Sequence, residues 1–162
     1  MFSKVRFFSF LLVCFSSQAS SSIDDYLPLT TGPTSSNYGE TGLYEMPTAR
    51  FQKAGNLKFG FSSFYPYEVT SISGSPFSWM EATFRYNEIK NQLYSPYSFY
   101  SGNQTLKDKG FDFKIRLLKE SRFLPAIAVG LRDLAGTGLF ASEYVVGSKR
   151  FGNLDTTIGI GW

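Results

Sequence analysis

The chain has 162 residues, with 16 Lys and Arg, 13 Asp and Glu, a single Cys and no His. The absence of histidine removes the usual general base of Ser-His and Cys-His hydrolases and the commonest metal ligand, so we predict no catalytic residue, no metal site and no cofactor. The near balance of charges excludes the basic surface of a nucleic-acid-binding protein, and the high aromatic content, 18% of residues, favours an all-β protein.

Residues 1–19 are predicted to be a cleavable signal peptide. Two basic residues, Lys4 and Arg6, precede an apolar run at residues 7–15, and this run is shorter than the roughly 20 residues that a membrane-spanning helix needs. The small and polar residues that follow suit cleavage before Ser20. Because Lys4 and Arg6 leave with the signal peptide, 14 basic and 13 acidic residues remain, a net charge of +1.

Cys14, the only cysteine, lies inside this apolar run. A lipoprotein signal carries a small residue directly before its cysteine, whereas Val13 occupies that position here. We therefore predict that Cys14 is removed with the signal peptide, and that the mature chain has no thiol, no disulfide and no attached lipid.

Residues 20–54 are predicted to form an extended N-terminal segment. Up to about Asn37 the segment is rich in Ser, Thr, Pro and Gly and has few apolar side chains to bury. Residues 39–50, which are interrupted by Pro47, suit a short strand and a turn. Pro47 and Arg50 have two interpretations here: they fix this segment against the mouth of a barrel, or they belong to a plain turn.

Residues 55–162 are predicted to form an antiparallel meander of about six strands, because apolar and polar residues alternate with a period of two. The alternation is cleanest at residues 110–119, where Phe111 and Ile115 face one way and Asp112 and Lys114 face the other. The strand lengths are close to the roughly ten residues that a tilted strand needs to cross a bilayer. The predicted strands are residues 57–64, 79–86, 110–119, 126–132, 139–148 and 154–162.

The polar face of this sheet has two interpretations. Its charged side chains either form the wet face of an amphipathic sheet and balance one another, or they line a polar lumen that contacts a hydrated sugar polymer. The carboxylates of Glu81 and Asp112 would do glycosidase chemistry if they converged, but no pattern in the sequence brings them together, and we predict no enzyme. The predicted lumen-facing residues are Glu81, Arg85, Asp112, Lys114, Arg116, Arg132 and Asp155.

The connections between the predicted strands differ in length. Residues 87–109 form a long connection, whereas residues 120–123 and 150–153 form short ones. Outer-membrane barrels place short turns on the periplasmic side and long loops outside, so strand 79–86 is predicted to run outward and strand 110–119 to return. Four aromatic residues of the long connection either contact a glycan or form an interfacial girdle or loop packing. They are Tyr94, Tyr97, Phe99 and Tyr100.

Six strands are too few for a single-chain outer-membrane barrel, which begins at about eight. An open sheet in lipid would also leave backbone groups unpaired. The chain is therefore the N-terminal piece of a longer protein, a subunit that closes by assembly, or not a membrane barrel. The main alternative is a soluble periplasmic or secreted glycan-binding β-sandwich, and a further one is a non-functional truncated remnant.

Several stretches of the sequence resemble the N-terminal part of the YjbH family. Any one of them is a weak match, but together they cover nearly the whole mature chain in order and with similar spacing. They are Gly-Leu-Tyr-Glu-Met-Pro-Thr-Ala-Arg at residues 42–50, Trp-Met-Glu-Ala-Thr-Phe-Arg-Tyr at 79–86, residues 107–117, residues 124–133, Gly-Thr-Gly-Leu-Phe at 136–140, and Ser-Lys-Arg-Phe-Gly at 148–152.

The resemblance implies a partial β-barrel in the outer membrane of a Gram-negative bacterium, connected with production or export of an exopolysaccharide or capsule. Its expected partners are the extracellular polysaccharide, outer-membrane lipid, the barrel-assembly machinery and other export proteins, with no nucleic acid. Family members are several times longer and continue with more strands, so the resemblance also implies that this chain corresponds to an N-terminal part.

Overall fold

The computed structural model describes residues 33–162 as an antiparallel seven-stranded meander with a small two-stranded sheet. The predicted signal peptide, residues 1–19, lies outside the described residues, as do residues 20–32. The predicted all-β fold is confirmed, since the described helix α1 (Ser98–Ser101) is a single turn. No helix in the described part of the chain is long and apolar enough to span a membrane. The small sheet contains β1 (Gly42–Leu43) and β2 (Met46–Pro47); the meander contains β3 (Leu57–Phe64), β4 (Tyr67–Phe77), β5 (Met80–Leu93), β6 (Thr105–Leu118), β7 (Ala126–Arg132), β8 (Ser142–Phe151) and β9 (Leu154–Gly161).

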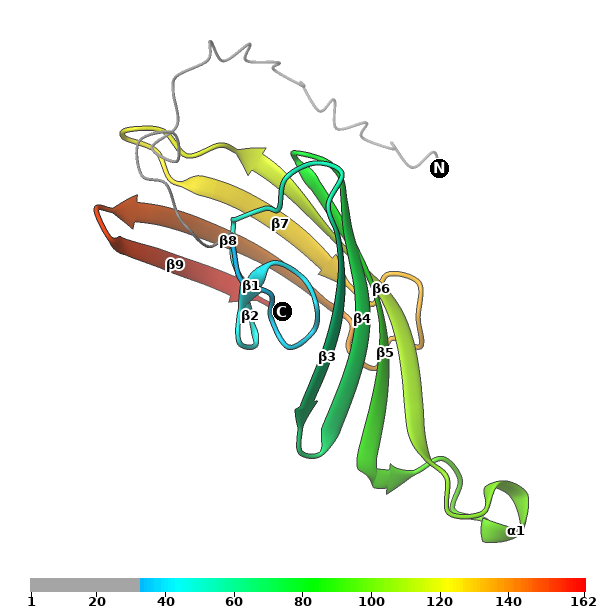
Figure 1. Ribbon diagram of the computed structural model, residues 1–162. Helices are drawn as coiled ribbons and strands as arrows, with labels where there is room; N and C mark the ends of the chain where they lie inside the picture. The colour runs from blue at the N-terminus through cyan, green and yellow to red at the C-terminus, as the bar shows by residue number, and fades with distance from the viewer. Residues whose placement is uncertain (1–32) are drawn as a thin grey trace, which may run out of the picture.

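The meander curls like part of a barrel wall. Every pair of neighbouring strands is antiparallel, in the order β3-β4-β5-β6-β7-β8-β9. In Figure 1 the small sheet lies in the hollow of this curl, between β3 and β9. We call residues 33–54 the inner segment.

The two faces of the curled sheet have the reverse of the usual distribution of polarity. Side chains that point away from the hollow are mostly apolar and exposed: Phe59 is 75% exposed and Ile158 is 82% exposed. Charged side chains that point into the hollow are buried, with Arg85 at 0% and Lys114 at 1% exposure. A protein in water normally buries its apolar residues and exposes its charged ones. This distribution matches a wall with an apolar environment outside and a polar interior.

A small apolar cluster holds the inner segment against one half of the wall. Phe51 of the inner segment packs with alanines of β7 and with Tyr144 and Val146 of β8. Small residues on β7 leave room for the inner segment, so packing is close in a region where the rest of the interface is polar. The cluster consists of Ala49, Phe51, Ala126, Ala128, Tyr144 and Val146.

Strand β4 is a strand that the sequence interpretation missed. Its inward-facing residues Ser71, Ser73 and Ser75 are buried, and Pro76 stands at its end. A serine-rich stretch that ends in proline is typical of a loop by composition. The serines are small because the inner segment lies directly on them: the Ser73 hydroxyl donates to the carbonyl of Gly39 at 2.7 Å.

Strands β5 and β6 are longer than predicted, and the connection between them is correspondingly shorter. Both have 14 residues, and Asn87 pairs with Asp108 in a register that continues to Ile89 and Leu106. The connection is therefore residues 94–104, and it contains α1. In Figure 1 it projects beyond the other strand connections. The added ends of β5 and β6 were missed because inward-facing residues such as Asn87 and Asp108 are polar, so apolar and polar residues do not alternate clearly there.

Candidate functional site

The candidate site is the polar interface between the inner segment and the concave face of the sheet. At its centre, the Glu81 carboxylate of β5 accepts hydrogen bonds from the backbone N–H of Thr41 at 2.6 Å and from its hydroxyl at 3.0 Å. Two lysines flank the same carboxylate, Lys58 of β3 at 3.2 Å and Lys114 of β6 at 3.1 Å. Lys114 also donates to the carbonyl oxygens of Thr41 at 2.8 Å and Arg50 at 3.1 Å. One buried ion cluster therefore joins three strands of the wall, β3, β5 and β6, to the inner segment.

A second cluster surrounds Glu40 of the inner segment. The guanidinium of Arg132, at the end of β7, donates to the Glu40 carboxylate from Nε at 3.1 Å and from Nη2. The hydroxyl of Tyr144 on β8 donates to the other oxygen of Glu40 at 2.7 Å. A buried carboxylate with a cation and a hydroxyl donor is stable only when all of these groups remain in place, so this cluster fixes the position of Glu40 between two strands.

The third cluster pairs Arg85 of β5 with Asp112 of β6, whose Nε and Oδ2 atoms are 3.0 Å apart. The backbone N–H of Asp133 donates to the other Asp112 oxygen at 2.8 Å. The Arg85 guanidinium lies 5.6 Å from the ring centroid of Tyr38 and 5.2 Å from that of Phe140, both within cation–π range. The inner segment therefore covers this ion pair through an aromatic ring.

Arg50 anchors the inner segment at the short-turn end of the sheet. Its guanidinium binds Asp155 of β9 at 2.6 Å and Glu120 of the β6–β7 turn at 2.5 Å. Burial of the guanidinium disfavours its charged form, but the hydrogen bonds to Asp155 and Glu120 outweigh burial and raise the pKa of Arg50. The nearby backbone N–H of Ala49 donates to the Ser148 hydroxyl at 2.9 Å. Of the two interpretations of Arg50, the geometry therefore favours fixation against the wall.

The structure places the seven predicted lumen-facing residues on the concave side of the sheet. Glu81, Arg85, Asp112 and Lys114 are almost completely buried beneath the inner segment. Arg116 lies 4.5 Å from the ring centroid of Phe51, Arg132 binds Glu40, and Asp155 binds Arg50. With the inner segment in this position, the four buried residues have no surface with which to touch a polymer.

The four aromatic residues of the long connection are exposed, and three of them contact one another. Ring centroids are 5.8 Å apart between Tyr97 and Phe99 and 6.5 Å apart between Phe99 and Tyr100. Exposure of Tyr94, Tyr97, Phe99 and Tyr100 ranges from 59% to 85%. They do not pack against the sheet, so they form an open aromatic surface beyond the ends of β5 and β6.

Several residues of the interface were not predicted. The inward orientation of Lys58 could have been predicted from the sequence, because Lys58 alternates with the apolar Leu57 and Phe59 on β3. No sequence pattern indicated the position of Glu40, since no regular strand surrounds it and its partners Arg132 and Tyr144 lie about a hundred residues later in the chain. Glu120 lies in a turn, and no sequence pattern indicated its contact with Arg50 either.

The interface has the chemistry of a structural and binding surface. Glu81 and Asp112, the two carboxylates considered for sugar hydrolysis, each have their own cation and lie beneath the inner segment. A glycosidase needs its two carboxyls to face a common space that admits the substrate. In the described residues this pair faces no such space.

The match to known proteins covers both the inner segment and the wall. The family model YjbH, described as "Exopolysaccharide biosynthesis protein YbjH", matches residues 34–162. The chain belongs to the YjbH family. A protein of Escherichia coli (strain K12) named "Uncharacterized lipoprotein YjbH" is 45% identical to it over 135 residues, which are 83% of this chain and 19% of that relative. No solved structure matches the chain.

The chain thus spans about a fifth of the length of this curated YjbH relative. The family match confirms the resemblance seen in the sequence motifs. It includes the inner segment, β1 to β9 and all the polar clusters that join them.

Proposed function

We propose that the chain is the N-terminal section of an outer-membrane β-barrel that serves exopolysaccharide production or export in a Gram-negative bacterium. The observation that carries this proposal is the reversed polarity of the curled sheet. Apolar side chains on β3, β6 and β9 point outward and are exposed, whereas charged side chains on β5 and β6 point inward and are buried. Lipid is the environment in which such an outer face is stable.

Residues at the two ends of the outer face also support a membrane-spanning band. At the short-turn end, Phe77 and Trp79 stack with ring centroids 5.3 Å apart, as in the aromatic girdle of a barrel. Toward the long connection the apolar residues give way to a row of charged residues in register across three strands, Glu68, Glu88 and Lys107. β4, β5, β6 and β8 have 10 to 14 residues, which is enough to cross a bilayer at a tilt.

The same observation disfavours the soluble β-sandwich. A sandwich covers the apolar face of a sheet with a second sheet. In residues 33–162, the layer that covers the meander is the inner segment, and it lies on the polar face. The strands β3 and β9 each have one neighbour in the described sheet, so we propose that further strands of a longer protein close the barrel.

The proposed role is non-catalytic: the protein binds or conducts polysaccharide, with outer-membrane lipid, the barrel-assembly machinery and other export proteins as partners. The inner segment covers the wall residues, so the open aromatic surface at Tyr94, Tyr97, Phe99 and Tyr100 is the first glycan contact in this proposal. Aromatic rings beside hydrogen-bonding groups suit the faces of sugar rings.

The proposal is tested by expressing the chain with a C-terminal tag in a Gram-negative host and fractionating the membranes. We expect a band in the outer-membrane fraction whose mobility on a gel changes after heating, because a folded β-barrel structure resists detergent until it is heated. A band that stays soluble without detergent would support the β-sandwich instead. Degradation or aggregation of the chain would show that these strands need the rest of a longer protein.

The mass of the chain extracted from that membrane fraction tests how it is exported. We expect a mature chain that begins at Ser20 and carries no lipid, because Val13 precedes Cys14. The Escherichia coli relative is named a lipoprotein, which supports export and membrane association for this chain. A mass equal to a chain that begins at a lipidated Cys14 would overturn the predicted cleavage site.

A further inference from the structure

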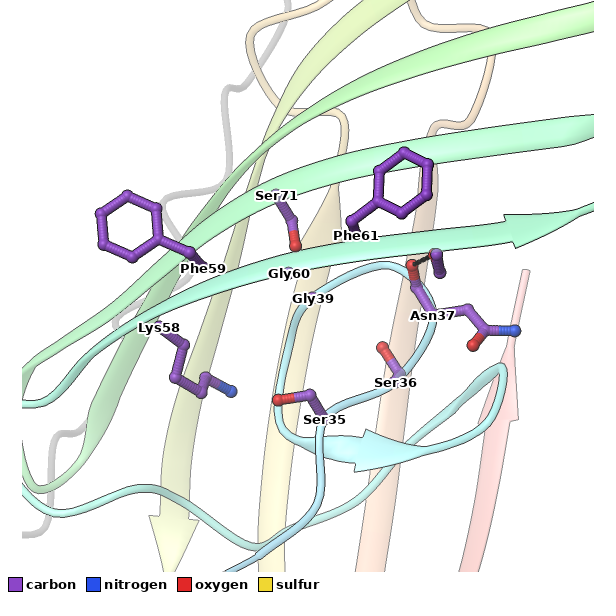
Figure 2. A pocket seen from close by; sticks show the side chains of 10 residues that line it. Ser35, Ser36, Asn37, Gly39, Lys58, Phe59, Gly60, Phe61 and Ser71 are labelled. Atoms are coloured by element: carbon purple, nitrogen blue, oxygen red, sulfur yellow. Dashed lines mark hydrogen bonds between the residues drawn. The ribbon is translucent and has the colours of Figure 1, made fainter.

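A polar cavity of about 220 Å³ lies between the inner segment and strands β3 and β4. At about 30 Å³ per water molecule, it has the volume of roughly seven waters, comparable to one sugar residue. Figure 2 shows that Phe59 and Phe61 point away from this cavity, toward the outer face of the wall, so the surface presented to it is polar. The lining residues are Ser35, Ser36, Asn37, Gly39, Lys58, Phe59, Gly60, Phe61, Ser62 and Ser71.

The cavity has a positive charge and no carboxylate in its lining. The ammonium of Lys58 points toward Ser35 in Figure 2, and the side chain of Lys58 is 20% exposed. Its carboxylate neighbour Glu81 is shared with the buried Lys114, so two ammonium groups meet one carboxylate and a unit of positive charge remains. An anionic group in the cavity would neutralise it.

Ser71 of β4 adds a hydroxyl to the cavity lining. The residue is 4% exposed, and Figure 2 shows its oxygen directed toward the space between Gly39 and Gly60. A serine hydroxyl both donates and accepts hydrogen bonds, so at the surface of a cavity it is a suitable partner for a polar ligand or water.

Two glycines keep this space open. A side chain at Gly60 would bring its Cβ to 2.7 Å from the Ser71 hydroxyl, and one at Gly39 would bring it to 2.2 Å. Gly39 also has a φ of +95°, which L side chains rarely adopt.

We infer that this cavity binds one acidic sugar residue of the polysaccharide, with Lys58 at the sugar carboxylate and the serine and asparagine side chains at its hydroxyls. This inference rests on the proposed function and adds a substrate class to it: a polymer that contains uronic acids or similarly charged sugars. A charged donor beside several neutral hydrogen-bonding groups discriminates a carboxylate from an ester or a neutral sugar.

The test is binding of tetragalacturonic acid and of its methyl ester to the whole chain purified in detergent, measured by calorimetry. We expect the acid to bind, the ester to bind at least about tenfold more weakly, and Lys58→Gln to weaken binding of the acid by at least about tenfold. Lys58→Gln should change binding of the ester less than about twofold, because the ester offers no charge to Lys58. Ser35→Trp, which fills the cavity and keeps the charge, should remove binding of both probes.

Lys53→Gln is the matched control, because it removes the same charge from an exposed residue outside the cavity lining. Absence of binding by the unaltered chain, or equal losses in Lys58→Gln and Lys53→Gln, would overturn the acidic-sugar site. If the chain nevertheless gives a heat-modifiable outer-membrane band, the proposed function stands and only this site fails. If the chain instead stays soluble without detergent, the proposed function fails whether or not the probe binds.

Discussion

Replacing Lys114 with methionine is expected to lower the free energy of unfolding by about 3 kcal/mol and to release the inner segment from the wall. The ammonium of Lys114 binds Glu81 and the carbonyl oxygens of Thr41 and Arg50. Methionine fills much of the same volume but leaves these acceptors unsatisfied. Breaking a buried ion pair costs about 3–5 kcal/mol, and the lower end applies here because Lys58 still faces Glu81.

Urea unfolding of the chain in detergent micelles measures this change, with the fluorescence of Trp79 and Trp162 as the signal. Limited trypsin digestion gives a second readout, because release of the inner segment exposes the peptide bond after Arg50 to cleavage. Lys109→Met is the control: Lys109 lies on the same strand, is exposed, and should change stability by less than about 0.5 kcal/mol. Equal stability of the two variants would mean that the cluster at Glu81 does not hold the inner segment.

The orientation of the wall side chains could be predicted from the sequence because it depends on a local pattern. On β6 the alternation of Phe111 and Ile115 with Asp112 and Lys114 assigns the two faces, and the structure exposes the first pair and buries the second. What the alternation leaves open is which face is covered by protein. Neither a wet face nor an open lumen includes the inner segment that buries Asp112 and Lys114 in the structure.

The inner segment could not be predicted in the same way. Its contacts join residues far apart in the chain, such as Glu40 with Arg132 and Arg50 with Asp155, and no periodicity marks them. The same contacts explain why β4 was missed. Its serines are buried beneath Gly39, and small polar residues in a strand interior are read as loop when the partner that packs on them is unknown.

The polar interface determines where the inner segment lies on the wall. Buried ion pairs contribute little net stability compared with apolar packing, but each requires one particular partner. Glu40 binds Arg132 of β7 and Tyr144 of β8, and Arg50 binds Glu120 of the β6–β7 turn and Asp155 of β9. These contacts therefore fix the inner segment in one position relative to the wall.

Replacing Phe59 with arginine is expected to lower the free energy of unfolding in a membrane by about 2–4 kcal/mol and to reduce the heat-modifiable band. Phe59 lies on the outer face of β3, in register with Ile72 of β4 and, through it, with Phe84 and Phe111. That row lies inside the apolar band, and arginine near the middle of a bilayer carries a cost of this size. The measurement is urea unfolding of the chain reconstituted in lipid vesicles, together with the gel assay.

The matched control is Phe99→Arg, because Phe99 is as exposed as Phe59 but lies in α1 beyond the strands. In water both substitutions replace an exposed phenylalanine with a charged residue, and each should change stability by less than about 0.5 kcal/mol. In a membrane only Phe59→Arg places a charge in lipid. A large loss for Phe59→Arg beside a small one for Phe99→Arg therefore supports the lipid-facing wall, whereas two equally small effects would mean that the outer face of β3 meets water.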